Sequence, residues 1–172
     1  MCQKAYTRLW ILRRLKALGV NKSVLLEVYV KQIRCIVEYA SPVWSGSLTK
    51  CQNNQIERVQ KAAFAIILGR QYTNYNVALN VLECESLESR RTVINLRFAK
   101  KCVKDRKFRH WFTSSQNFRT NTTTRSCKNL SFAPVQARTK AFENSPISYL
   151  TKLLIEDRRI QFTQSTPVNQ GL

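Results

Sequence analysis

A single polar stripe along an otherwise apolar helix is the feature that most constrains this fold. Between Glu27 and Glu38 the charged side chains are spaced by four, three and four residues: Glu27, Lys31, Arg34 and Glu38. This spacing places all four on one face of an α-helix, as two opposite-charge pairs four residues apart. Apolar side chains occupy most of the remaining circumference, so the helix must be buried on several sides. The segment therefore predicts the central helix of a bundle, which begins at the N-cap Asn21 and stops at Ser41-Pro42.

Helical periodicity also covers most of the rest of the chain. Apolar residues recur at steps of three and four over five further segments, residues 4–18, 49–68, 74–82, 87–104 and 148–159. Gly19 and Gly69 stand where helices commonly end, and Ser86 can cap the fourth of these segments. Arg8 and Lys16 interrupt the apolar face of the first. With 4 Gly and 4 Pro in 172 residues and only short loops between segments, the chain predicts an all-α fold, a small helical bundle.

The composition of the chain changes after Phe112. Residues 113–131 are mostly Ser, Thr, Asn and Gln, which is the composition of a polar linker. We therefore expect four regions: a helical bundle over 1–112, a polar Ser/Thr/Asn-rich linker over 113–143, a C-terminal helix over 144–162 and a disordered tail over 163–172. Within the bundle, helical spacing predicts four core aromatic residues, Tyr29, Tyr39, Phe64 and Phe98.

The excess of positive charge indicates the kind of partner. The chain has 29 Lys and Arg against 10 Asp and Glu, a formal net charge of +19, yet 44% of its residues are hydrophobic. That hydrophobic content is enough for a packed core, so the chain is not a basic disordered tail. A compact domain with this charge repels itself unless it meets a polyanion, which makes nucleic acid or an anionic membrane surface the expected partner.

The densest positive charge lies between Arg90 and Arg109, where nine Lys or Arg residues stand against the single acid Asp105. Four of the nine are spaced by seven, four and three residues and would share one face of a helix: Arg90, Arg97, Lys101 and Lys104. This stripe is about 21 Å long and could meet several successive phosphates. An ordinary solvated helix face is the alternative, although such faces usually intersperse acids. Because nothing in the run resembles a base-reading code, we expect sequence-tolerant and salt-sensitive binding.

Several classes of site are excluded by what the sequence lacks. Six cysteines occur without a CxxC pair and His110 is the only histidine, so we expect no zinc site and reduced, mostly buried thiols. The two aspartates, Asp105 and Asp157, stand 52 residues apart, and no Gly-rich phosphate loop, GxSxG or HExxH motif occurs. We therefore expect no enzyme activity, cofactor or metal, and a surface or partly packed role for His110. No apolar run reaches the roughly 18 to 20 residues of a membrane span.

The N-terminus bears on localisation. No apolar signal segment opens the chain, which predicts an intracellular protein, cytoplasmic or nuclear. A mitochondrial address is the alternative, because six Lys or Arg residues precede the first acid, Glu27, as they do in transit peptides.

Two blocks of sequence resemble a known family. They are Glu38-Tyr39-Ala40-Ser41-Pro42-Val43-Trp44 and Ile56-Glu57-Arg58-Val59-Gln60-Lys61-Ala62-Ala63-Phe64. The likeness continues in order through Ser86-Leu87-Glu88-Ser89-Arg90-Arg91, Phe98-Ala99-Lys100-Lys101, Trp111-Phe112 and Ser145-Pro146-Ile147. Over residues 4 to 155 the chain is similar to the region that follows the reverse transcriptase palm in LINE-type, jockey-like non-LTR retrotransposons.

The resemblance implies a thumb and post-thumb region, whose helical bundle grips the template–primer duplex by its backbone. A polymerase palm needs clustered aspartates that hold two metal ions, and this chain contains no such cluster, so we expect a non-catalytic fragment without palm or endonuclease. Its partners would be RNA or RNA–DNA duplex and a reverse transcriptase palm. Charge and helix face then select the candidate nucleic-acid-binding residues: Arg8, Arg13, Arg14, Arg90, Arg91, Arg97, Lys100, Lys101, Lys104 and Lys107.

Two other interpretations of the same sequence stay open. The chain could be a decayed element fragment with no selected function, which would expose apolar surface and aggregate without its palm. It could also be a basic mitochondrial ribonucleoprotein subunit that uses its N-terminus as an address.

Overall fold

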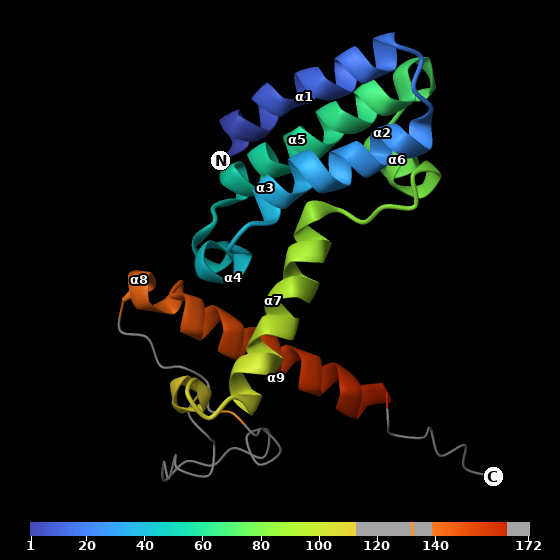
Figure 1. Cartoon of the computed structure of the whole chain (residues 1–172). Coiled ribbons are helices and arrows are strands. Elements are labelled where there is room, and N and C mark those ends of the chain that lie inside the picture. Colours follow the sequence, from blue (N-terminus) through green and yellow to red (C-terminus); the bar gives the residue numbers. More distant parts are fainter. Residues whose placement is uncertain (113–131, 133–138, 165–172) are drawn as a thin grey trace, which may run out of the picture. The chain divides into compact units, whose positions relative to one another are not determined.

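The computed structural model describes residues 1–112, Phe132 and 139–164, with side chains as far as Asp157. The elements over these residues are helices, so the predicted all-α class is confirmed (Figure 1). The chain divides into two compact units. Unit 1 consists of Met1–Ser41 and Leu48–Arg91, and unit 2 of Pro42–Ser47 and Thr92–Leu172. The division falls inside the bundle that the sequence predicts over 1–112.

Unit 1 is a bundle built around α5. Its elements are α1 (Cys2–Ala17), α2 (Lys22–Val28), a π-helical segment η1 (Tyr29–Arg34), α3 (Cys35–Glu38), α5 (Lys50–Leu68), the short η3 (Gly69–Gln71), α6 (Tyr75–Val81) and the first turn of α7 (Leu87–Lys104). Helix α5 packs against α1, α2 and α6, and Figure 1 shows α1, α5 and the α2–α3 run lying side by side. The helices match the predicted segments to within a few residues.

Local capping explains where these helices begin and end. The Asn21 side chain accepts a hydrogen bond from the Val24 N–H at 3.0 Å, so the predicted N-cap is confirmed. Thr49 and Gln52 form a reciprocal capping box at the start of α5. Gly19 and Gly69 follow α1 and α5 with φ of 78° and 57°, a left-handed conformation that glycine adopts without steric cost.

The predicted helix over 21–40 is continuous but not a uniform α-helix. Its buried side chains stand at strict four-residue steps: Leu25, Tyr29, Ile33 and Val37. In an α-helix of 3.6 residues per turn that spacing drifts by about 40° per step. A π-helical segment places more residues in each turn, and η1 spans the middle of this run, so it keeps the four on the core side. The helical run ends at Glu38, and Ala40 adopts a left-handed φ of 52°.

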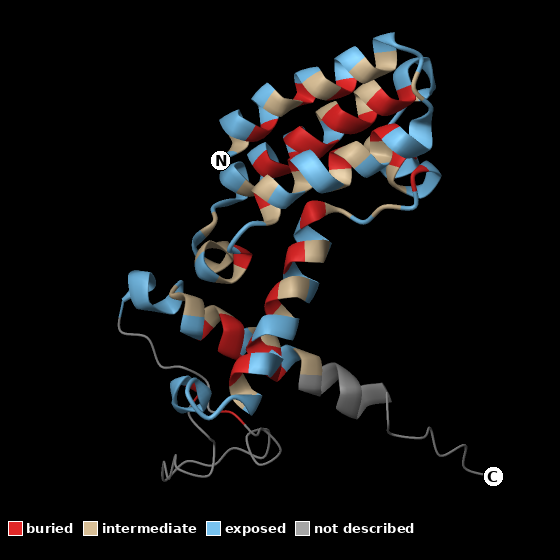
Figure 2. Cartoon of the chain, in the orientation of Figure 1, coloured by how far each residue is buried: buried red, intermediate tan, exposed pale blue. Residues whose placement is uncertain are grey.

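The core of unit 1 is formed by buried residues of α1, η1 and α5, and Figure 2 colours the buried positions red. The Tyr29 and Phe64 rings meet edge to face at 5.6 Å. The two basic residues that interrupt the apolar face of α1 have structural partners. Arg8 donates to the Gln32 carbonyl at 3.2 Å, and the Lys16 ammonium donates to the Ile67 carbonyl at 2.8 Å, in the last turn of α5.

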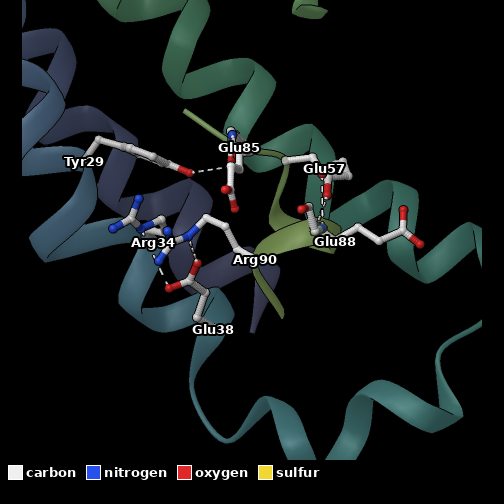
Figure 3. Close-up of polar contacts among 10 residues, drawn as sticks. Tyr29, Arg34, Glu38, Glu57, Glu85, Glu88 and Arg90 are labelled. Atoms are coloured by element: carbon white, nitrogen blue, oxygen red, sulfur yellow. Dashed lines mark hydrogen bonds and ion pairs between the residues drawn. The ribbon is translucent and has the colours of Figure 1, made fainter. Parts of the chain in front are cut away.

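A line of polar side chains on α5 holds the start of α7. The Glu57 carboxylate is buried and accepts a hydrogen bond from the Glu88 backbone N–H at 2.7 Å (Figure 3). It also accepts one from the Tyr75 hydroxyl at 2.6 Å. Gln60, one turn later, accepts from the Tyr29 hydroxyl at 3.0 Å and donates to the Glu85 carbonyl at 2.9 Å. Because a helix N-terminus presents unpaired N–H groups and a positive dipole end, the Glu57 carboxylate stabilises the first turn of α7.

Unit 2 contains most of α7 together with the C-terminal helices. It holds the end of α4 (Ser41–Trp44), η2 (Ser45–Ser47), α7 from Thr92, η4 (Arg109–Trp111), α8 (Lys140–Glu143) and α9 (Pro146–Gln164). Its core includes Ala99, Cys102, Phe112, Phe132, Leu150 and Leu154. Gly46 is packed tightly on α9, since a Cβ there would lie 2.6 Å from the Cβ of Tyr149.

Several details differ from the expectations. The segment 113–143 was predicted to be a linker, but its end forms α8, which Thr139 caps by accepting the Phe142 N–H at 3.3 Å. Within the predicted linker the structure describes Phe132 and residues 139–143, and the rest of the linker lies outside the described residues. Residues 165–172 of the predicted tail also lie outside them. Helix α9 runs over Pro146–Gln164, so it begins and ends two residues later than the predicted C-terminal helix region 144–162. Thr163 and Gln164, which the sequence assigns to a disordered tail, are helical.

The predicted core is right for Tyr29 and Phe64 and wrong for two aromatic residues. Tyr39 is 78% exposed because the helix ends one residue before it, and Phe98 is 41% exposed because the smaller Ala99 faces the core of unit 2. The thiols that the structure describes are free, but only Cys102 among them is buried, so the expectation of mostly buried cysteines is wrong for this part of the chain.

We expect Glu57→Ala to destabilise unit 1 by about 2–4 kcal/mol, because it removes the acceptor of the Tyr75 hydroxyl and of a helix N-terminal N–H. Urea unfolding followed by far-UV circular dichroism measures the change. Glu85→Ala, the same substitution at an exposed position, should stay within about 0.5 kcal/mol of wild type. Equal stabilities of the two variants would contradict the role given to Glu57.

Unit 1 should also lose stability in alkali. Burial raises the pKa of the Tyr29 and Tyr75 hydroxyls well above the ordinary value near 10, and the hydrogen bond to Glu57 adds to the effect at Tyr75. In the unfolded chain these phenols ionise near pH 10, whereas in the folded chain they keep their protons. Their stabilisation is therefore complete below about pH 10 and falls as the pH rises further.

Urea unfolding at a series of pH values from about 8 to 11 tests this dependence. The double variant Tyr29→Phe, Tyr75→Phe should be less stable at neutral pH and should lose less of its remaining stability above pH 10 than wild type does. Tyr39→Phe removes an exposed phenol and should keep the wild-type slope. A double variant with the wild-type slope would refute the assignment.

Candidate nucleic-acid interface

The outward face of α7 in unit 2 carries four of the residues that the sequence predicts to bind nucleic acid. Positions 95, 99 and 102 are buried, which leaves the opposite side of the helix to solvent. That side carries the exposed residues Arg97, Lys100, Lys101 and Lys104. From Arg97 to Lys104 the helix rises about 10 Å. One strand of a duplex presents about three phosphates over that length, since its charges repeat every 3.4 Å along the axis.

An ion pair reduces the charge that one of these residues can offer. Lys100 donates to the Asp157 carboxylate on α9 at 2.8 Å. This contact ties α9 to α7 within unit 2 and partly neutralises Lys100. Arg97, Lys101 and Lys104 therefore carry most of the positive field of the face.

The positive charge continues past the end of α7. The turn that follows contains Arg106, Lys107 and Arg109, all exposed, and Asp105 is the one acid between Thr92 and Phe112. The Asp105 carboxylate accepts the Lys107 backbone N–H at 2.9 Å, so it helps to shape the turn. With seven basic and one acidic side chain, residues 92–112 have a formal charge of +6.

The predicted residues on α1 belong to unit 1. Arg13 and Arg14 are exposed in the last turns of the helix, where cations also suit the helix dipole. Arg8 is half-buried and bonded to Gln32. The candidate residues on α1 and on α7 from Thr92 onward lie in two separate units, and their binding of nucleic acid stays a prediction.

The first turn of α7 holds two predicted residues that serve the fold instead. Arg90 donates to the Glu38 carboxylate at 2.7 Å, and Arg34 approaches the other oxygen of that carboxylate at 3.8 Å (Figure 3). The hydrogen bond to Glu38 raises the pKa of Arg90. Arg91 is only 3% exposed and donates to the Asn53 side chain on α5. The exposed part of the cationic stripe predicted from Arg90 onward therefore begins at Arg97.

Sequence reasoning missed the aromatic residues of the turn. Phe108 and Trp111 pack on each other with ring centroids 4.8 Å apart, and the ring centroids of His110 and Trp111 are 6.2 Å apart. All three are exposed. The available signal was the alternation of aromatic and basic residues between Lys107 and Trp111, a pattern typical of surfaces that bind single-stranded nucleic acid.

We also searched the described residues for a metal site and for a membrane-spanning helix. Within residues 1–112 and 139–157, with Phe132, no three His, Cys, Asp or Glu side chains gather where they could hold a metal ion. None of the helices in that same part of the chain combines the length and the apolar character needed to cross a bilayer. No protein-family model, curated protein or solved structure matches the chain. A functional assignment therefore depends on the residues of this chain and on their geometry.

We expect Arg91→Ala to lower the free energy of unfolding by about 2–4 kcal/mol, since it empties a buried site and leaves the Asn53 side chain without this donor. Arg97→Ala removes the same side chain from the exposed face of the same helix and should change stability by less than about 0.5 kcal/mol. Thermal unfolding compares the two, and a larger loss for Arg97→Ala would reverse their assigned roles.

Proposed function

We propose that this chain is the thumb and post-thumb region of a jockey-like non-LTR retrotransposon reverse transcriptase, and that it binds RNA or RNA–DNA duplex through phosphates without catalysing a reaction. The exposed cationic face of α7 is the observation that supports the proposal most strongly. Arg97, Lys101 and Lys104 stand opposite the buried Ala99 and Cys102, so the core of unit 2 holds the charged face in place.

The chemistry of this face suits a phosphate backbone. Its cations lie at intervals along a straight helix, and a polyanion of regular charge spacing can neutralise several of them together. Base recognition would require polar side chains that match donor and acceptor patterns in a groove, and the face consists mainly of Lys and Arg. The interface should therefore tolerate many sequences.

A protein partner fits the same proposal. Tyr6 and Trp10 lie one turn apart on α1 and are exposed, as is Leu18 just beyond the helix. Exposed large apolar side chains gathered on one helix are typical of a surface that another protein covers. We assign this surface to the reverse transcriptase palm.

Binding to an RNA–DNA duplex should weaken steeply as salt rises from about 50 to 200 mM, because each neutralised phosphate releases counterions. The triple variant Arg97→Gln, Lys101→Gln, Lys104→Gln should reduce the slope of log K against log salt by about 2–3, close to 0.9 for each lost contact. Fluorescence anisotropy with a labelled duplex measures both quantities.

A matched control removes three exposed cations of unit 1, through Lys50→Gln, Arg58→Gln and Arg70→Gln. It should leave the slope within about 1 of wild type. If the control reduces the slope as much as the α7 variant does, attraction to the whole charged chain explains binding. Affinity that is indifferent to salt would overturn the proposed function itself.

A further inference from the structure

The turn after α7 is ordered by its backbone and by buried residues on both sides. The Asp105 carbonyl accepts the N–H groups of Phe108 at 3.2 Å and Arg109 at 3.0 Å, and the Phe108 carbonyl accepts that of Trp111 at 3.0 Å. Cys102 before the turn and Phe112 after it both belong to the core of unit 2. The turn therefore has a shape that its backbone hydrogen bonds and its buried flanking residues define.

Two aromatic rings project from this turn. Phe108 and Trp111 are 37% and 38% exposed, and their planes meet at 57°. The aromatic contact in the core is made by Phe112, whose ring meets Phe132 edge to face at 6.3 Å. Phe108 and Trp111 are not among the buried residues of that core, and they pack on each other with part of their aromatic surface exposed.

The surroundings of the pair are cationic. Lys104, Arg106, Lys107 and Arg109 are all exposed and lie within a few residues of the two rings. Rings offer flat apolar surface to a base, and cations offer charge to the phosphates on either side of it. An acidic peptide without aromatic residues would satisfy the cations but supplies no flat group for the rings. The combination favours a nucleic-acid strand whose bases are unpaired.

We propose that the Phe108–Trp111 pair stacks an unpaired base of a single-stranded segment, while Lys104, Arg106, Lys107 and Arg109 hold the phosphates next to that base. The proposal rests on the proposed function and extends it. The α7 face binds duplex backbone, and the turn at the end of the same helix receives the strand where pairing stops.

The test compares three ligands with the full-length chain by fluorescence anisotropy at one salt concentration. They are a blunt RNA–DNA duplex, the same duplex with an unpaired tail of about eight thymidines, and the same duplex with an abasic tail of equal length. The abasic tail keeps the phosphates and lacks the bases. Stacking predicts that the thymidine tail binds about 5- to 150-fold tighter than the abasic tail, the range measured for one stacked base.

Variants then locate the effect. Trp111→Leu and Phe108→Leu keep apolar bulk without a ring and should bring the two tailed ligands to nearly equal affinity. Trp111→Phe retains a ring and should keep most of the preference. Tyr39→Leu removes a more exposed aromatic residue from unit 1 and should leave the preference unchanged. Far-UV circular dichroism and thermal unfolding confirm that the leucine variants fold.

A second measurement uses the protein's own fluorescence. In the variant Trp10→Phe, Trp44→Phe, Trp111 is the one remaining tryptophan of the chain. Its emission should be quenched by the thymidine tail and not by the abasic tail.

The outcomes separate this inference from the proposed function. Salt-dependent duplex binding with equal affinity for the two tails, or a preference that survives Trp111→Leu, overturns stacking and leaves the duplex grip intact. Failure of all three ligands to bind overturns both. Displacement of the tailed duplex by a polyglutamate peptide as effectively as by unlabelled single strand would show that charge alone attracts ligands to the turn, and would also overturn stacking.

Discussion

The buried Glu57 carboxylate is the interaction on which the arrangement of unit 1 depends. It meets the α7 N-terminus and the Tyr75 hydroxyl at once, so one side chain joins α5 to both α6 and α7. A carboxylate inside a helical bundle costs desolvation unless hydrogen bonds replace water, and both of these bonds do so. Gln60 and Asn53 extend the same polar line to the Glu85 carbonyl and to Arg91. The start of α7 is thereby held in place by directional contacts as well as by apolar packing.

Helix α7 consequently combines two chemistries along its length. Its first turn belongs to unit 1, where Arg90 and Arg91 form contacts with Glu38 and Asn53. From Thr92 onward the helix belongs to unit 2, and its cations face solvent. The same residue type is therefore structural at one end and available for binding at the other. The exposed cations of this helix begin where the polar contacts of unit 1 end.

Much of the helical structure could be predicted from the sequence, because its signals are local. Asn21, the Gly69 stop and the spacing of apolar residues on α5 each act within a few residues, and the structure confirms them. The glutamates were less predictable. Glu57 and Glu38 occupy positions that resemble an ordinary helix surface, yet their partners lie 31 and 52 residues along the chain. The same distinction applies to the candidate site. The run of basic residues could be predicted because it is a property of the local sequence, whereas the burial of Arg91 could not, because it depends on packing against α5.

The sequence by itself determined that the chain is helical, where most of its helices begin and end, and that strong positive charge is concentrated around α7. These properties follow from periodicity, capping and charge, which need no distant partner. Only the tertiary structure decided which cations are free to bind, that the run over 21–40 contains a π-helical segment, and that Phe108 and Trp111 stand exposed beside one another. Burial and pairing depend on which segments meet in space, and that is a property of the packed chain.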